Sequence, residues 1–168
     1  MREFSNPEYD RKSSSETALR MTDAAVEFLS SLADEQRQSV LFSFEDPERK
    51  NWDYRPKKRN GLDLKDMEEA QKKKALVLLA ESLSESGSQK ALGVMELEKI
   101  PGMVEGKSGG FARDPELYYV SIFGDPDSES IWGWRIEGHH LSVNYLVVKG
   151  QFVAFAPSFF GANPARVP

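Results

Sequence analysis

The spacing of apolar residues changes once along this chain, and the change limits the possible folds more than any other feature. Over most of the stretch from Thr22 to Ile100, apolar residues recur at the intervals of a helix that buries one face. From Leu117 onward, β-branched and aromatic residues fill short segments separated by turn residues, which is typical of strands. Helices followed by strands predict an α+β fold, with N-terminal helices packed on a C-terminal antiparallel β-meander.

Local signals place the individual elements of this predicted fold. The helical segments are Thr22 to Leu32, Glu35 to Leu41, Met67 to Leu83 and Gln89 to Ile100. The strands are Leu117 to Phe123, Ile131 to Glu137, His140 to Val148 and Gln151 to Ala156. Lys149 and Gly150 are predicted to form a two-residue hairpin turn, because Gly150 can supply a positive φ.

The length of 168 residues suits one domain with a sizeable core. The segment from Met1 to Arg20 is polar, and its few apolar residues offset too little of the entropy of ordering it. We therefore predict a disordered or extended tail over residues 1–20 and a single α+β domain over residues 21–168.

Composition excludes several classes of function. The net charge of −5 argues against general nucleic-acid binding, and the lack of cysteine excludes disulfide scaffolds, thiolate zinc sites and cysteine nucleophiles. No apolar stretch resembles a signal peptide or membrane anchor, so no membrane association is expected and a cytoplasmic location is the default. No pattern indicates the oligomeric state.

The charged segment from Glu45 to Asn60 contains Trp52 and Tyr54, so we expect it to pack on the rest of the protein. Its basic run, Arg55 to Arg59, is expected to be a solvated part of that loop.

Polar and aromatic residues crowd into the segment from Trp132 to Asn144, which contains the only two histidines. If the strand stays extended through Gly138, Glu137 and His139 share one face. A carboxylate and an imidazole so placed can act as a general base or supply two metal ligands. A bulge at Gly138 would re-aim both histidines. If side chains alternate without interruption along the strand, the residues on its other face are Trp132, Trp134, His140, Ser142 and Asn144.

A divalent metal would need a further ligand, because there is no third histidine. That ligand would come from Glu98, Asp114 or Asn144, although no spacing matches a known zinc motif.

A structural interpretation competes with each functional one. Glu137 can pair with Arg135 or Arg113 in a structural network while a histidine satisfies a buried backbone group. Trp132 and Trp134 can line a ligand groove, but such a stripe is more often the core face of a sheet.

Several longer motifs resemble a known family. They are Asn51-Trp52, Arg113-Asp114-Pro115, Tyr118-Tyr119, Phe123-Gly124-Asp125-Pro126, Phe160-Gly161-Ala162-Asn163-Pro164 and the whole segment from Trp132 to Asn144. In these motifs the chain from Ala24 to its end resembles a bacterial and fungal family called domain of unknown function 3500. The resemblance implies no activity, and it implies that family members continue past Pro168 into another helical segment. The family pattern resembles this chain at Glu98, Arg113, Trp132, Trp134, Arg135, Glu137, His139, His140 and Asn144.

The leading hypothesis is a small-molecule enzyme, metal-dependent and hydrolase-like, with a Glu/His/His cluster. Glu137 would orient an imidazole, and His139 or His140 would act as acid/base or metal ligand. An anionic substrate group would bind Arg113 or Arg135. The other candidate substrate-binding residues are Trp132, Trp134 and Asn144. The alternative is a non-catalytic module that binds a ligand or a protein through an aromatic groove.

Overall fold

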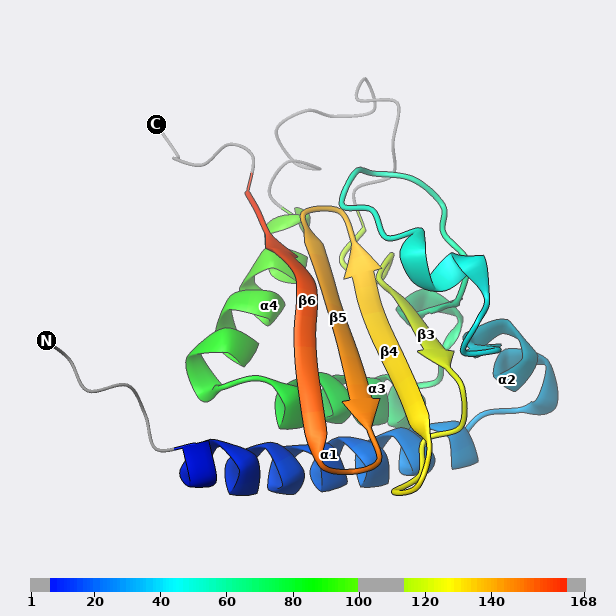
Figure 1. Ribbon diagram of the computed structural model, residues 1–168. Helices are drawn as coiled ribbons and strands as arrows, with labels where there is room; N and C mark the ends of the chain where they lie inside the picture. Colours follow the sequence, from blue (N-terminus) through cyan, green and yellow to red (C-terminus); the bar gives the residue numbers. More distant parts are fainter. Residues whose placement is uncertain (1–6, 100–113, 163–168) are drawn as a thin grey trace, which may run out of the picture.

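The computed structural model describes residues 7–99 and 114–162, with side chains from residue 14 onward except that of Phe152. The described part of the chain contains helices followed by strands, and it is an α+β fold as predicted (Figure 1). The helices are α1 (Pro7–Ser30), α2 (Asp34–Val40), α3 (Glu69–Ser82) and α4 (Glu85–Leu97), with short 3-10 turns at Pro47–Lys50 and Leu64–Asp66. The strands are β1 (Leu41–Phe42), β2 (Leu62–Asp63), β3 (Tyr119–Phe123), β4 (Ile131–Gly138), β5 (Leu141–Val148) and β6 (Phe152–Phe160).

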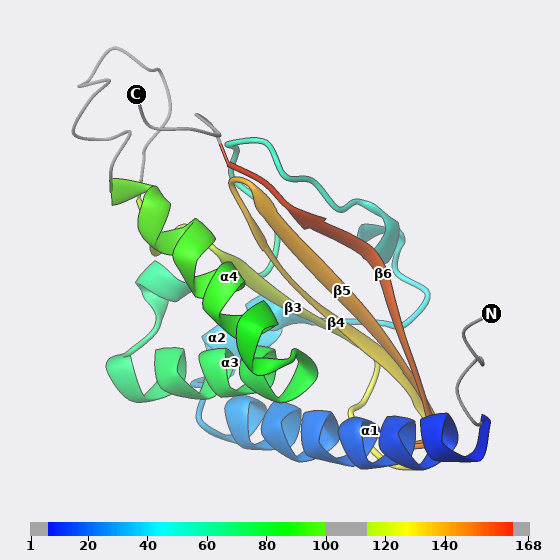
Figure 2. The same ribbon diagram turned by 90° about the vertical axis from the view of Figure 1, so that its left-hand side faces the viewer.

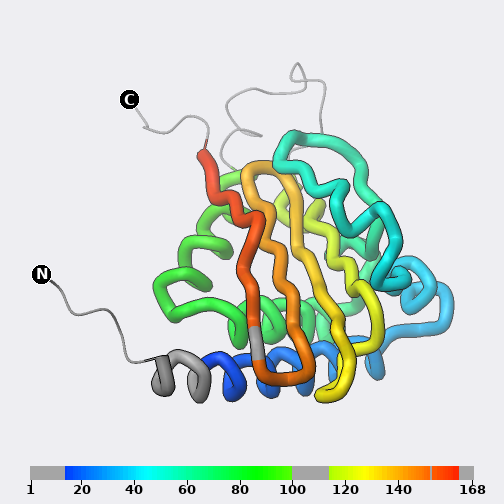
Figure 3. The backbone as a smooth tube through the Cα atoms, in the orientation of Figure 1, coloured from blue at the N-terminus to red at the C-terminus, as the bar shows by residue number. Residues whose placement is uncertain are grey.

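The sheet has the strand order β1-β3-β4-β5-β6, with the short β2 paired to β3. Strands β3 to β6 are antiparallel and consecutive, so the predicted meander is confirmed, and Figure 3 traces it from strand to strand. The short β1 adds to β3 in parallel. Helices α1, α3 and α4 lie on one side of the sheet, and the segment from Phe44 to Gly61 lies on the other (Figure 2).

The core lies between the sheet and these helices. Trp132, Trp134 and Ile136 of β4 alternate onto this face and are buried. Tyr145 of β5 stacks on Trp134 with ring centroids 5.1 Å apart. The burial of large aromatic and aliphatic side chains is the main contribution to the stability of such a core.

The N-terminal helix begins much earlier than the sequence indicates. Helix α1 starts at Pro7 rather than at Thr22, so the predicted tail over residues 1–20 is helical from Pro7 onward. Ala18 and Met21 are fully buried, and the Ser14 hydroxyl accepts a hydrogen bond from the backbone N–H of Val153, 3.1 Å away. These partners come from distant parts of the chain, which is why local composition does not reveal them.

Other boundaries follow local chemistry. Helix α4 begins after Ser84, whose hydroxyl accepts a hydrogen bond from the N–H of Gly87 at 3.2 Å, earlier than the predicted start at Gln89. The turn after β5 lies at the predicted Lys149 and Gly150, with φ of 50° and 59°. It has three residues rather than two, because Val148 pairs with Phe152 and Gln151 belongs to the turn. None of the helices in the described residues is long and apolar enough to cross a bilayer.

Candidate functional site

His139 and His140 form the two-residue turn between β4 and β5. Gly138 pairs with Leu141, and His140 has a positive φ of 62°. The turn reverses the chain, so the prediction that Ser142 and Asn144 share a face with the two core tryptophans is wrong. Both side chains lie on the opposite face of the sheet, where Ser142 pairs with Glu137 and Asn144 with Arg135.

Three hydrogen bonds from separate parts of the fold anchor the backbone of this turn. The N–H of His140 donates to the carbonyl of Tyr54, and the N–H of Gly161 donates to the carbonyl of His140, each at 2.8 Å. The Tyr118 hydroxyl donates to the carbonyl of His139, also at 2.8 Å. The histidines are therefore carried by a turn that the fold holds on several sides.

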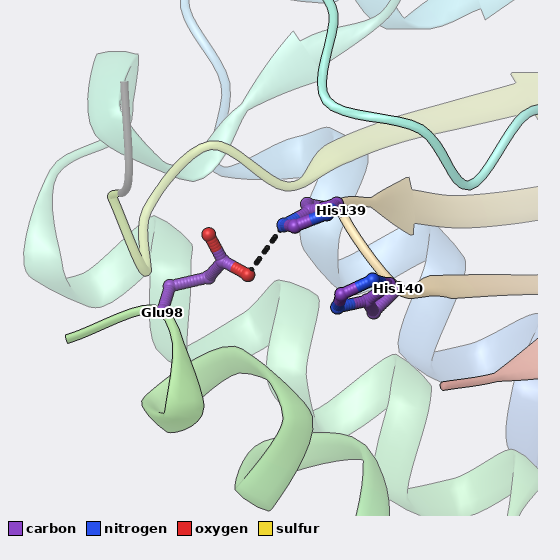
Figure 4. Close-up of side chains that lie close together, drawn as sticks. All are labelled: Glu98, His139 and His140. Atoms are coloured by element: carbon purple, nitrogen blue, oxygen red, sulfur yellow. Dashed lines mark hydrogen bonds and ion pairs between the residues drawn. The ribbon is translucent and has the colours of Figure 1, made fainter. Parts of the chain in front are cut away.

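Glu98 lies immediately after α4, and its side chain reaches the histidine turn (Figure 4). Its Oε1 is 2.7 Å from Nδ1 of His139, and the His139 and His140 rings are stacked with centroids 3.7 Å apart. Glu98 is buried, whereas both histidines are partly exposed. One possible ligand atom from each residue lies within 4.8 Å of the other two.

A cleft of about 330 Å³ adjoins this cluster. Both Glu98 and His139 line it, so the buried carboxylate and one imidazole face the same space. The other side chains around the cleft are Pro56, Lys57, Lys58, Arg59, Asp63, Asp114, Leu117, Tyr118 and Tyr119.

Glu137 belongs to a different, buried cluster on the far side of β4. Its Oε2 accepts hydrogen bonds from the N–H of Asp53 at 2.8 Å and from the Ser142 hydroxyl at 3.3 Å. Its Oε1 is 3.2 Å from Nε of Arg135 and 3.6 Å from Nε of Arg59. These are ion pairs only, because the geometry between the three atoms does not meet that of a hydrogen bond. Burial raises the pKa of Glu137, and the two guanidinium groups oppose this rise. The carboxylate bonded to His139 is therefore that of Glu98 and not that of Glu137. Glu137 lies beside Arg135, as the structural interpretation of the sequence predicts.

Four of the remaining candidates, Arg135, Asn144, Trp132 and Trp134, do not line the cleft. Arg135 is fully buried and bonds Glu48, with Nη2 2.6 Å from Oε1. Asn144 donates to the Ser142 hydroxyl at 3.1 Å and to the carbonyl of Pro157 at 2.9 Å. Trp132 and Trp134 are core residues with no accessible ring face. Arg113 lies outside the described residues.

The loop from Glu45 to Asn60 contributes to the surroundings of the site in a way that the sequence does not indicate. It packs on the sheet as expected, with the Tyr54 ring stacked on Phe159 at 4.1 Å. Arg59, expected in a solvated run, is buried and donates to the carbonyls of Lys57 and Gly138 at 2.7 and 3.0 Å. The only signal for this was the pair of aromatic residues in the loop, which indicates packing but not which basic residue is buried.

Comparison with known protein families shows which family this chain belongs to. The model of a family described as protein of unknown function (DUF3500) matches residues 14–168. The chain belongs to the DUF3500 family. Neither a curated protein nor a solved structure matches it. The expected resemblance is thus confirmed, and the DUF3500 match takes in the histidine turn, Glu98 and the cleft between them.

Gly138, at the start of the histidine turn, lies in closely packed surroundings in this DUF3500 protein. A Cβ at this position would lie 2.4 Å from Cδ1 of Tyr118 and 2.8 Å from the carbonyl oxygen of Leu117. We expect Gly138→Ala to lower the free energy of unfolding by about 1–3 kcal/mol, because the Tyr118 ring or the backbone must shift. Urea denaturation measures this change.

Gly93→Ala is the matched control for that variant. Gly93 lies inside α4, and a Cβ there meets no atom within 4 Å. It should raise stability by about 0.5–1 kcal/mol, since alanine favours the helix. Equal effects of the two substitutions would contradict the tight packing of Gly138.

Proposed function

We propose that this protein is a small-molecule enzyme, hydrolase-like, that holds a divalent metal ion on Glu98, His139 and His140. The observation that carries the proposal is the convergence of one carboxylate and two imidazoles within 4.8 Å, next to a cleft of about 330 Å³. A volume of this order suits a small ligand.

The ligand types support a catalytic rather than a purely structural metal site. Two imidazoles and one carboxylate are the set used by catalytic zinc sites and by non-haem iron sites, and both leave coordination positions open. A tetrahedral ion holds neighbouring N and O ligands about 3.3 Å apart. The Glu98–His139 pair at 2.7 Å would therefore need to open by only roughly 0.6 Å.

Within this proposal each residue has a limited role. A bound divalent ion would supply a Lewis acid and an activated water. Glu98, held in a buried position beyond α4, would supply the carboxylate ligand, and Tyr118 would fix the turn through its hydrogen bond to the His139 carbonyl. The cleft would hold the substrate beside these groups.

Metal titration tests the proposal directly. We expect purified protein to bind one Co²⁺ or Zn²⁺, and Glu98→Gln, His139→Gln and His140→Gln each to weaken binding by at least about tenfold, because even the loss of an outer-shell partner has an effect of that size. Isothermal titration calorimetry and elemental analysis provide the measurements.

Glu96→Gln is the control, because Glu96 is an exposed carboxylate on the same helix whose partner is Lys99. It should bind metal like the wild type. Equal affinity in the wild type and the three ligand variants would rule out this site.

A non-catalytic binding module is the second candidate. Trp52 and Tyr54 are partly exposed, and Tyr54 stacks on Phe159, so the surface opposite the helices carries an aromatic cluster. A ligand whose binding is lost in Trp52→Ala and Tyr54→Ala, but kept in Glu98→Gln, would favour this function.

A further inference from the structure

We infer that the cleft beside Glu98 and His139 takes a small anionic ligand, a carboxylate or a phosphate, and that Lys58 binds its negative group. The inference rests on the proposed function, because the anion is taken to be the substrate or a part of it. It adds that the substrate carries a negative charge, which neither the family match nor the metal ligands indicate.

The acidic side chains around the cleft already have partners. Asp63 accepts a hydrogen bond from the N–H of Asp66 at 2.9 Å. Asp114 pairs with Lys65 at 2.7 Å, and Glu98 bonds His139. The charge of Asp114 is therefore balanced by Lys65, and Lys58 and Lys65 are the cations that act on the Asp63 carboxylate.

The three basic side chains around the cleft differ in whether they have partners. Lys57 pairs with Asp53, with Nζ 3.1 Å from Oδ2. Arg59 is surrounded by backbone carbonyls and lies near the Glu137 carboxylate. Among the described residues Lys58 is the charged lining residue with neither a hydrogen bond nor an ion pair, although its charge acts on the Asp63 carboxylate.

The backbone that carries Lys58 is held rigid. The Arg59 guanidinium donates to the carbonyls of Lys57, Arg55, Asp53 and Gly138, and so ties the loop to the end of β4. The Asp53 carboxylate in turn accepts from the N–H of Arg55 at 2.9 Å. A wall that is ordered before the ligand arrives loses less conformational entropy on binding.

Charge balance supports the same conclusion. Three basic and three acidic side chains line the cleft, so their formal charges cancel. A divalent ion on the proposed ligand set would leave the cleft positive. A ligand with a negative group would restore neutrality, and the ammonium group of Lys58 is the side chain available to bind that group.

Anion titration of the full chain, with and without Co²⁺, tests the inference. The probes are acetate and inorganic phosphate, with acetamide as the neutral analogue of acetate, and binding is followed by histidine NMR resonances and the Co²⁺ absorption band. We expect acetate or phosphate to bind and acetamide not to bind. Lys58→Met should weaken anion binding about tenfold to a hundredfold, the loss of one charge-assisted hydrogen bond.

Lys73→Met is the matched control, because Lys73 is an exposed lysine on α3 away from the cleft. It should bind anions like the wild type. Preference for phosphate over acetate, or the reverse, identifies the anionic group. Absence of anion binding, or equal binding by the wild type and Lys58→Met, would overturn the inference.

The two proposals fail separately in this experiment. A Co²⁺ band that no anion alters, together with unchanged histidine resonances, contradicts the anionic ligand and leaves the metal site standing. Anion binding that depends on Lys58 but occurs without any Co²⁺ band supports the ligand class and contradicts the metal.

Discussion

Arg135→Met is expected to lower the free energy of unfolding by about 3–5 kcal/mol, the usual cost of breaking a buried ion pair from one side. Arg135 is fully buried and lies between two carboxylates, 2.6 Å from Oε1 of Glu48 and 3.2 Å from Oε1 of Glu137. Methionine fills much of the same volume but leaves both carboxylates with fewer partners. Chemical denaturation monitored by tryptophan fluorescence measures the loss.

The pKa of Glu48 shows how strongly this buried carboxylate depends on the groups that donate hydrogen bonds to it. Burial alone would raise that pKa, but hydrogen bonds from Asn51, Asn60 and Arg135 together hold it below its ordinary value. The double variant Arg135→Met/Glu48→Gln should therefore lose less than the sum of the single losses, because the orphaned charge is removed.

Lys99→Met is the control, because it breaks an exposed ion pair with Glu96. Its expected effect is under about 1 kcal/mol. A similarly small loss for Arg135→Met would mean that the buried ion pairs contribute little to stability. The loop from Glu45 to Asn60 would then be held by its aromatic contacts and by its other hydrogen bonds to the sheet.

The sequence was sufficient to predict the order of helices and strands, because hydrophobic period is a local property. It was also sufficient to place the turn after β5 at Lys149 and Gly150, although not to include its third residue, Gln151. It could not identify the carboxylate that bonds His139. Glu98 is separated from His139 by 41 positions, whereas Glu137 is only two residues away and is the partner that local spacing favours.

The error over Ser142 and Asn144 has a similar origin. Alternation assigns faces correctly within a strand, but the chain reverses at His139 and His140, and every assignment after the turn is inverted. Gly138 was recognised as a point of irregularity, yet the turn itself uses two histidines, one with positive φ. Such a turn has no standard sequence signal, since glycine and asparagine are the residues that normally mark one.

Trp134→Ala is expected to lower the free energy of unfolding by about 3–5 kcal/mol, because it removes a large buried ring and leaves a cavity. The ring lies nearly parallel to that of Tyr145, with an interplanar angle of 13°, and Trp134 is only 1% exposed. Its indole N–H has no hydrogen-bond partner among the described residues, so the substitution leaves no orphaned acceptor and the loss comes from packing. Thermal and urea denaturation both report it.

Trp52→Ala provides the contrast, because Trp52 is 36% exposed and belongs to the loop from Glu45 to Asn60. It should change stability by about 0.5 kcal/mol or less, as is usual for surface positions. The comparison separates a core role for Trp134 from a role in an aromatic ligand groove, since groove residues contribute to binding more than to folding. A stable Trp134→Ala variant that lost ligand binding would contradict the core assignment and return this tryptophan to the site.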